Sequence, residues 1–276
     1  MRVDELTGLP ALEDADFQRI SELMFRVSGI RIEANKKMLV SGRLLKRLKA
    51  LHLADFHSYV QRLQQDSAQE ERRLVVDLLT TNETFFFREE AHFDFLRALI
   101  ADHPGASWRM WSAACSSGEE VYSLAMLMDQ LLPGSQRWHL LGSDICRHAL
   151  ETASSAIYPL SRAKGVPDAM LRRYCLRGVG EMEGFLQIQP ILRQQVSFRC
   201  INLNQPLPGD LPLFDVVFLR NILIYFDQVG KKTLLDRVLN RLRPGGYLFV
   251  GHSESLYGMD LPLTPCGSAV YFREEA

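Results

Sequence analysis

Two short segments of the chain carry residues whose types and spacing suit the binding of a nucleoside. A run that reads as a buried strand, 108–115, ends in a turn of small residues at 116–118, and Glu119 then opens a helix. About one strand–helix–strand unit later, a second strand ends on Asp144. Small residues let the backbone approach a ligand closely, and a carboxylate that closes the next strand can accept hydrogen bonds from ribose hydroxyls. The pattern predicts a pocket for an adenosine-containing ligand.

The same turn argues against a dinucleotide. Its one glycine, Gly118, stands where dinucleotide folds use G-x-G-x-x-G to bring a pyrophosphate against a helix N-terminus. Glu119 and Glu120 at a helix start would repel a pyrophosphate and would suit a cationic ligand. S-adenosylmethionine carries a ribose, an ammonium and a sulfonium, and no phosphate, so it fits. The alternative is a plain α/β domain whose acids only favour the helix N-terminus.

Composition sets the outer bounds. A chain of 276 residues with 47% hydrophobic and 24% charged residues has room for one large globular domain or two. A net charge of −1 argues against a protein that coats nucleic acid. The five cysteines are scattered without a C-x-x-C pair, which is typical of reduced thiols in the cytoplasm. We expect neither a signal peptide nor direct membrane insertion, because the N-terminus is acidic and no run of about 18 apolar residues occurs.

The first eighty residues read as helices. Apolar residues recur at helical spacing over 17–27, and Gly29 is the expected stop. Further helices are expected at about 35–51, 59–63 and 74–79. Because no strand pattern interrupts them, we predict a helical domain over 10–80.

The second of these helices concentrates positive charge. Lys36, Arg43 and Arg47 form a narrow stripe, Lys46 lies beside it, and no acid occurs between Lys36 and Lys49. The opposite, apolar face is expected to hold Met38, Leu44, Leu45, Leu48 and Leu51. A cationic face is usually only solvated, and an acidic partner is the alternative.

From Trp108 onward, strand and helix patterns alternate as in a doubly wound α/β sheet. Asn202 and Asn221 stand where two strands end, at the sheet edge where such folds bind ligands, although an asparagine there can also cap a helix. Residues 174–195, including 190–193, interrupt the alternation and look like an antiparallel excursion. We predict a second domain over 81–276 with an inserted β-subdomain at about 174–200.

Three other patterns are weighed and given structural readings. The run 251–255, Gly-His-Ser-Glu-Ser, resembles a hydrolase nucleophile elbow, but its last glycine is missing and no histidine follows His252. The histidines show no H-x-x-x-H pair, so no metal site is predicted. The triple phenylalanine at 85–87 reads as core rather than as a stacking platform.

Together the segments resemble the CheR-type chemotaxis receptor methyltransferases over nearly the full length. The matching motifs are LLTTNET (78–84) with FFRE (86–89), WSAA (111–114) with SGEE (117–120), GSDI (142–145), FD (214–215) with RN (220–221) and IYFD (224–227), and GHSES (251–255). Each motif alone is weak, and their combination, in order and at compatible spacing, is highly specific.

The resemblance implies a helical N-terminal domain, a doubly wound, Rossmann-like S-adenosylmethionine domain and a small inserted antiparallel subdomain. It implies methyl transfer to glutamate side chains on the cytoplasmic helices of chemoreceptors, with S-adenosylhomocysteine as product. The cofactor contacts that it implies are Asn82, Thr84, Arg88, Glu119, Asp144, Asn202, Leu203, Asn221 and Ile222. Arg88 and Tyr225 are the catalytic candidates, which would orient the carboxylate or shape the methyl pocket.

Two partner surfaces are expected on the same ground. Lys36, Arg43, Lys46 and Arg47 would dock the glutamate-rich receptor helix. Some family members hold a receptor's C-terminal pentapeptide on the inserted subdomain, and Gly178, Gly180 and Gly184 look like that version, although glycines also serve hairpin turns. We expect a cytoplasmic monomer that binds no nucleic acid. A methyltransferase of small molecules or nucleic acid and a non-catalytic S-adenosylmethionine sensor are the alternatives.

Overall fold

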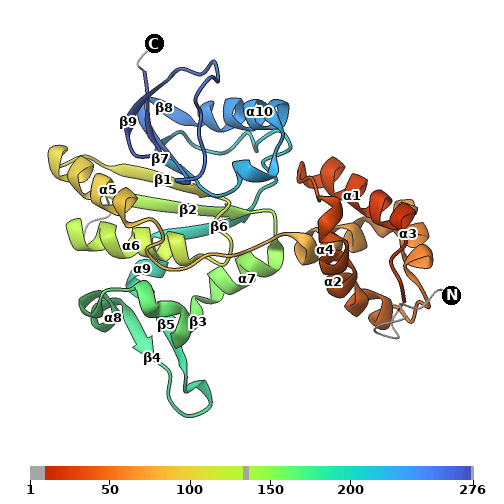
Figure 1. Cartoon of the computed structure of the whole chain (residues 1–276). Coiled ribbons are helices and arrows are strands. Elements are labelled where there is room, and N and C mark those ends of the chain that lie inside the picture. The colour runs from red at the N-terminus through yellow and green to blue at the C-terminus, as the bar shows by residue number, and fades with distance from the viewer. Residues whose placement is uncertain (1–9, 133–136, 275–276) are drawn as a thin grey trace. The chain divides into compact units, whose positions relative to one another are not determined.

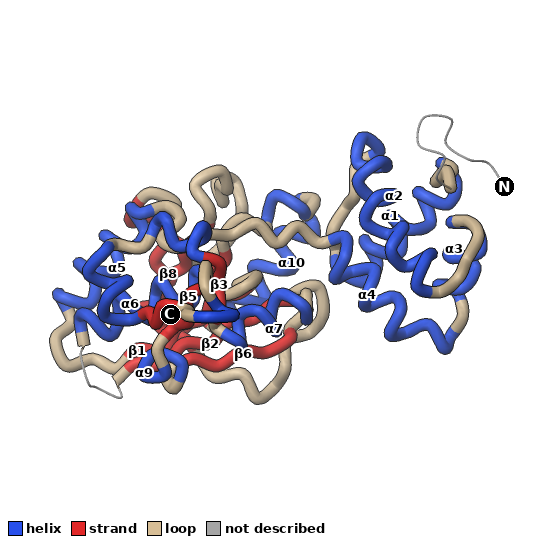
Figure 2. Tube along the Cα trace, turned by 90° about the horizontal axis from the view of Figure 1, so that it is seen from below, coloured by secondary structure: helices blue, strands red, loops and turns tan. Residues whose placement is uncertain are grey.

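The computed structural model describes residues 10–132 and 137–274 of the chain. The chain divides into two compact units, with the boundary between Thr81 and Asn82. The first unit is built from helices and the second holds both β-sheets (Figures 1 and 2). The predicted fold class, a helical domain followed by a doubly wound α/β domain, is confirmed.

The first unit packs four helices around an apolar centre. They are α1 (Asp14–Ser28), α2 (Lys37–Ala50), α3 (Phe56–Gln64) and α4 (Gln69–Leu79), with short 3-10 turns η1 (Ala34–Lys36) and η2 (Asp66–Ala68). α1 ends as predicted at Gly29, whose φ of 76° lets its N–H donate to the carbonyl of Phe25. The Asp55 side chain accepts a hydrogen bond from the N–H of Ser58 and so caps α3.

The predicted apolar face of α2 is wrong in part. The buried side chains of this helix are Val40, Leu44 and Leu48, which recur every four residues. Met38, which we expected beside them, is 69% exposed. Six residues separate Met38 from Leu44, a rotation of roughly 240° about the helix axis, so the two cannot share a narrow face.

The second unit is organised by a seven-stranded sheet in the order β6-β2-β1-β7-β8-β10-β9. Its strands are β1 (Trp108–Ala113), β2 (Trp138–Asp144), β6 (Val196–Cys200), β7 (Phe214–Leu219), β8 (Leu242–Val250), β9 (Leu263–Gly267) and β10 (Val270–Arg273). The five strands from β6 to β8 are parallel, and β10 is antiparallel to both of its neighbours. The associated helices are α5 (Glu90–Asp102), α6 (Glu119–Leu131), α7 (Arg147–Ser155) and α10 (Gln228–Leu239), with the 3-10 turn η5 (Leu223–Tyr225).

Both faces of the central strands are buried. Along β1, Met110 belongs to the cluster that includes α5 and α6, and Trp111 belongs to the cluster that includes α10. Phe218 and Leu219 of β7 divide in the same way. Successive side chains of a strand point to opposite faces, so a sheet covered on both sides needs continuous apolar strands.

The inserted subdomain differs from its predicted bounds. Its sheet has the order β3-β5-β4 and is formed by β3 (Ile157–Pro159), β4 (Cys175–Arg177) and β5 (Phe185–Ile188), with η3 (Leu160–Gly165), α8 (Asp168–Tyr174) and η4 (Gly180–Met182) between them. It therefore begins near 157 rather than 174, because a strand of three residues shows no alternation to read. Residues 190–193, expected in the antiparallel insertion, form the short helix α9 (Pro190–Arg193), and 196–200 pair in parallel with β2 in the main sheet.

No helix in the described part of the chain is long and apolar enough to cross a membrane.

Candidate active site

The carboxyl ends of three parallel strands meet at one edge of the main sheet. β1 lies between β2 and β7, so the chain leaves β1 in one direction to build β2 and returns on its other side to build β7. Ligands of doubly wound folds bind at this point, where the direction of winding reverses. The turn after β1, Asp144 at the end of β2 and the segment 220–226 after β7 all lie at this edge.

Asp144 holds the turn after β1 in place. One carboxylate oxygen accepts a hydrogen bond from the backbone N–H of Ser116 at 2.8 Å, and the other accepts one from the N–H of Cys146 at 2.9 Å. The side chain is buried, with 7% exposure for the residue. Ala114 and Ser116 both have positive φ, which keeps the turn tight. The structure thus brings together the turn and the acid that the sequence singled out.

The segment after α4 joins this arrangement. The hydroxyl of Ser116 donates to the carbonyl of Asn82 at 3.0 Å, and the Asn82 side-chain amide lies 3.2 Å from the sulfur of Cys146, as a donor to it. Thr84 is half-buried two residues further on. Asn82 therefore lies beside Asp144 although 62 positions separate them in the numbering.

Glu119 lies in the interior rather than at the open edge. It is fully buried, the Ser117 hydroxyl donates to its carboxylate at 2.7 Å, and the Arg162 guanidinium lies 2.6 Å from its other oxygen. Burial raises the pKa of Glu119, and Ser117 and Arg162 counteract this effect. Gly118 admits no side chain, because a Cβ there would lie 2.7 Å from that of Ala153 and its φ is +92°.

Glu120, the second acid at the start of α6, also has internal partners. Glu120 accepts a hydrogen bond from the Ser112 hydroxyl at 2.7 Å and forms an ion pair with Arg220, also at 2.7 Å. Glu119 and Glu120 are therefore not the unpaired charges that the sequence argument assumed. Each acid already has an internal arginine partner, Arg162 or Arg220.

Arg220 is the central residue that the sequence analysis left without a role. Its side chain is 2% exposed and forms ion pairs with Glu89 at 3.0 Å and Glu120 at 2.7 Å. It also donates to the backbone carbonyl of Arg88. Arg220 thereby ties the segment before α5, the start of α6 and the end of β7 together. Its position directly after the buried strand β7 was the sequence feature that could have identified it.

Glu254 fixes the segment after β7. Its carboxylate accepts hydrogen bonds from the backbone N–H groups of Asn221 at 2.8 Å, Leu223 at 2.7 Å and Gly251 at 2.7 Å. Asn221 has a φ of 57°, a conformation that needs such support. Glu254, within the run 251–255, thus holds the segment after β7 in place.

The remaining predicted site residues differ in what they touch. Arg88 is half-buried, lies 5.7 Å from the Phe85 ring and donates to the Glu83 carbonyl at 3.2 Å. The Asn202 side chain accepts a hydrogen bond from the N–H of Asn204, and the Leu203 side chain is buried in the core. Ile222 and Tyr225 are partly buried beside the same core cluster.

Two of the four predicted docking cations have internal partners. Arg43 donates to the carbonyls of 78–80 at the end of α4, at 3.0–3.2 Å. Arg47 makes a two-pronged ion pair with Glu71, at 2.8 and 2.7 Å, and the Tyr59 hydroxyl donates to the same carboxylate. A helical stripe cannot reveal partners on other helices, and the docking role of Arg43 and Arg47 stays a prediction. The exposed cations of the predicted set are Lys36 and Lys46.

The three glycines of the inserted subdomain are explained by its own backbone. A Cβ on Gly178 would lie 1.9 Å from the carbonyl oxygen of Met182. Gly180 and Gly184 have φ values of +60° and +86°, which favour glycine in the connection between β4 and β5. The hairpin alternative accounts for these conformations, and the peptide-holding role of the glycines stays a prediction.

The fold and this edge are those of a Rossmann-like α/β domain with a ligand-binding sheet edge. The family comparison adds the class of the protein, an S-adenosylmethionine-dependent methyltransferase. The chain belongs to the CheR methyltransferase family. The model of the CheR methyltransferase SAM binding domain matches residues 82–272, and that of the CheR methyltransferase all-alpha domain matches residues 15–80.

Curated relatives agree over nearly the whole length. The chain is 39% identical over 274 residues to the chemotaxis protein methyltransferase of Escherichia coli (strain K12), covering 97% of this chain and 93% of the relative. It is 38% identical over 264 residues to chemotaxis protein methyltransferase 2 of Pseudomonas aeruginosa, covering 93% and 92%. Among solved structures, the N-methyltransferase NodS of Bradyrhizobium japonicum in complex with S-adenosyl-L-homocysteine has a TM-score of 0.34 at 18% identity, covering 70% of each chain; a similarity this low adds nothing to the assignment.

Proposed function

We propose that the protein transfers the methyl group of S-adenosylmethionine to glutamate side chains in the cytoplasmic domains of chemoreceptors, forming methyl esters. Membership of the CheR family supports this function, as do relatives named chemotaxis protein methyltransferase. The observation that carries it is the position of Asp144, oriented by two backbone N–H groups beside the turn after β1. A carboxylate held there suits the two hydroxyls of a ribose.

The proposed cofactor site extends from Asp144 along the sheet edge. Asn82 and Ser116 lie against it, and Asn221 stands on the far side of β1 in the segment that Glu254 clamps. The other proposed contacts are Thr84, Arg88, Glu119, Asn202, Leu203 and Ile222. For Glu119 and Leu203, whose side chains are buried, the contact would come from the backbone or through neighbouring residues.

The chemistry asks little of the protein beyond positioning. Bound S-adenosylmethionine supplies a methyl carbon made electrophilic by the adjacent sulfonium. A glutamate carboxylate has an ordinary pKa of about 4.3 and is ionised at neutral pH, so no general base is needed. Orienting the carboxylate in a site that excludes water is then the main task of the chain. We assign this task to Arg88 and Tyr225. Arg88 directly precedes Glu89 in the chain, and Tyr225 directly follows the segment that Glu254 holds.

The bond formed on the receptor tests this function directly. Incubation with methyl-labelled cofactor and receptor-bearing membranes should label the receptor, and mild alkali should release the label as methanol, because esters hydrolyse whereas methylated amines do not. Label that survives alkali would refute carboxyl methylation. Label found only on small molecules or nucleic acid would support the first alternative, and cofactor binding without any transfer would support the sensor.

A docking role for the cationic helix is tested by charge reversal at its exposed lysines. Changing Lys36 and Lys46 to Glu should slow receptor methylation at low salt while leaving cofactor affinity unchanged, because exposed charges mainly steer association and are screened by salt. The matched control changes two exposed cations of the second unit, Arg97 and Arg172, to Glu, with the same change in net charge. Equal methylation rates for both double variants would contradict the proposal.

A receptor tail could add a strand to the open edge of β4. Within this subdomain the sheet order leaves β4 at an edge, and Leu176, Val179, Met182 and Phe185 are exposed apolar residues around it. Tyr174 and Gly178 hydrogen-bond toward β5, so antiparallel alternation turns the backbone N–H of Arg177 outward. We propose that this edge holds the C-terminal pentapeptide of some receptors by strand addition.

Replacing Arg177 with Pro tests the tail proposal. The change removes the outward N–H and spares the pairs with β5, so it should abolish binding of tail peptides in a calorimetric titration. Arg177→Ala keeps the N–H and should retain most of the binding, which separates strand addition from simple charge attraction. A parent protein that binds no tail peptide would place this chain among the untethered members. We further propose that the enzyme acts as a monomer in the cytoplasm, where the proposed substrate domains lie.

A further inference from the structure

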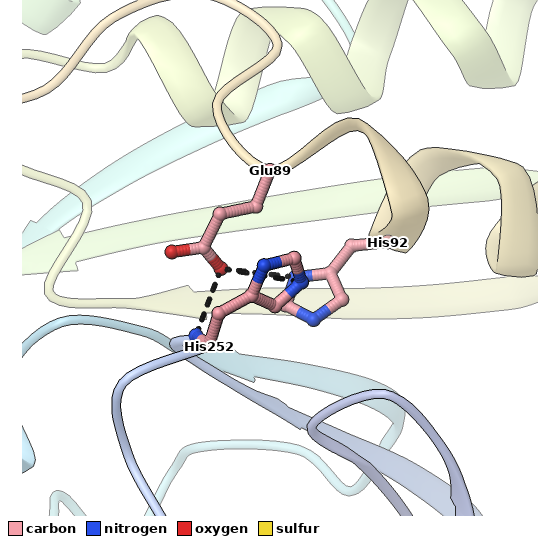
Figure 3. Close-up of side chains that lie close together, drawn as sticks. All are labelled: Glu89, His92 and His252. Atoms are coloured by element: carbon pink, nitrogen blue, oxygen red, sulfur yellow. Dashed lines mark hydrogen bonds and ion pairs between the residues drawn. The ribbon is translucent and has the colours of Figure 1, made fainter.

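A cluster of three potential metal ligands lies beside the Arg220 network. Glu89 and His92 stand at the start of α5, and His252 follows β8 (Figure 3). The Glu89 carboxylate oxygen lies 3.5 Å from Nδ1 of His92 and 4.0 Å from Nε2 of His252. One ligand atom from each residue lies within 4.8 Å of the others. A tetrahedral zinc ion, with ligands at about 2.1 Å, separates its ligand atoms by roughly 3.4 Å, so small side-chain rotations suffice.

The buried ring of His92 faces this cluster with an unsatisfied nitrogen. His92 is fully buried, and its Nε2 lies 3.1 Å from the backbone carbonyl of Ser268. A carbonyl only accepts, so Nε2 carries the proton, and Nδ1 of the neutral ring presents a lone pair toward Glu89. Nδ1 has no hydrogen-bond partner. Two acceptors therefore face each other across 3.5 Å, an arrangement that a bound cation would stabilise.

The orientation of the His92 ring also suits a metal ligand. Metal-bound histidines usually donate their other ring N–H to a carbonyl or carboxylate, as His92 does to Ser268.

We propose that Glu89, His92 and His252 form a binding site for a divalent transition-metal ion such as Zn²⁺. Two neutral imidazoles and one carboxylate leave a fourth position for water or another ligand. The half-exposed ring of His252 provides the entry path. Glu89 and Glu120 both form ion pairs with Arg220. The net charge of these three side chains is −1, so the cluster remains attractive to a cation. An occupied site would tie the start of α5 to the segment after β8.

Titration with Zn²⁺ tests the site, with His252→Gln as the main variant. All proteins compared should carry Ser in place of the exposed Cys200 and Cys266, because thiolates also bind zinc. Calorimetry should show one equivalent bound to the parent and at least a tenfold weaker affinity in His252→Gln. Co²⁺ should give the visible bands of a tetrahedral nitrogen and oxygen site, without a thiolate charge-transfer band.

The matched control is His148→Gln, which removes an exposed histidine 3.4 Å from Glu151 and should bind Zn²⁺ like the parent. His92→Gln should also lose the ion, provided that tryptophan fluorescence shows it folded; otherwise His252→Gln decides. A parent that binds no Zn²⁺, or binding that His252→Gln leaves unchanged, would overturn the proposal.

Discussion

Replacing Asp144 with Asn should weaken the binding of S-adenosylmethionine by about 1.5–3 kcal/mol, roughly 10- to 150-fold in affinity. The carboxylate accepts from the N–H groups of Ser116 and Cys146, and it is the proposed acceptor for the ribose hydroxyls. An amide presents one acceptor oxygen and one donor NH₂. One of the two backbone N–H groups would face a donor, and the ribose would lose a charged acceptor.

Calorimetric titration with S-adenosylmethionine and S-adenosylhomocysteine measures this effect. The control is Asp236→Asn on α10, which removes an exposed carboxylate paired with Lys232 and should leave both affinities unchanged. Circular dichroism establishes that each variant is folded. Parental affinity in a folded Asp144→Asn protein would remove Asp144 from the proposed site.

Replacing Arg220 with Met should destabilise the second unit by about 3–5 kcal/mol at neutral pH. Methionine fills a similar space, but Glu89 and Glu120, whose side chains are only 14% and 13% exposed, then lose the cation that pairs with both. The carbonyl of Arg88 also loses its donor. Removing one partner of a buried ion pair is costly because the other charge stays desolvated.

The cost should shrink as the pH falls. Burial raises the pKa of Glu89, but Arg220 and the hydrogen bonds to it more than offset this and hold the pKa below its ordinary value. In the parent, the stability from this pair is therefore present above the ordinary carboxyl pKa and is lost as the pH falls through the lowered one. In Arg220→Met, acid neutralises the unpaired Glu89 carboxylate and removes the cost of burying its charge, so the two stability curves should converge.

Tryptophan fluorescence during chemical denaturation reads this out, because all three tryptophans, Trp108, Trp111 and Trp138, lie in the second unit. The matched control is Arg199→Met. Arg199 also makes a two-pronged ion pair, with Asp210, but at the surface, where such pairs contribute little. Similar losses in the two variants would show that the burial of Arg220 is not the cause.

The local elements of this protein follow from short-range sequence patterns. The stop of α1 at Gly29 was predicted because a left-handed residue ends a helix wherever it occurs. The strand β7 was predicted because a strand covered on both faces is mostly apolar, and β1 and β2 were predicted because mainly buried residues precede the small-residue turn and the acid. Asp144 was identified because strand, turn and acid lie within one unit of the chain, and the sheet then aligns their ends.

The partners of the charged side chains were decided by the tertiary structure alone. Arg43 and Arg47 formed a docking stripe on a helical wheel, yet α4 supplies carbonyls for one and Glu71 for the other. Arg220 pairs with Glu89 and Glu120, which stand 131 and 100 residues before it.

The physical reason is that hydrophobic periodicity specifies which face of an element is buried, but not which element covers it. A long charged side chain can reach partners on several elements, and its choice depends on where the fold brings them. The sequence by itself therefore determined the class of fold, the turn and acid at the sheet edge, and the family. The tertiary structure decided which charged side chains form internal ion pairs at that edge and which remain exposed to a partner.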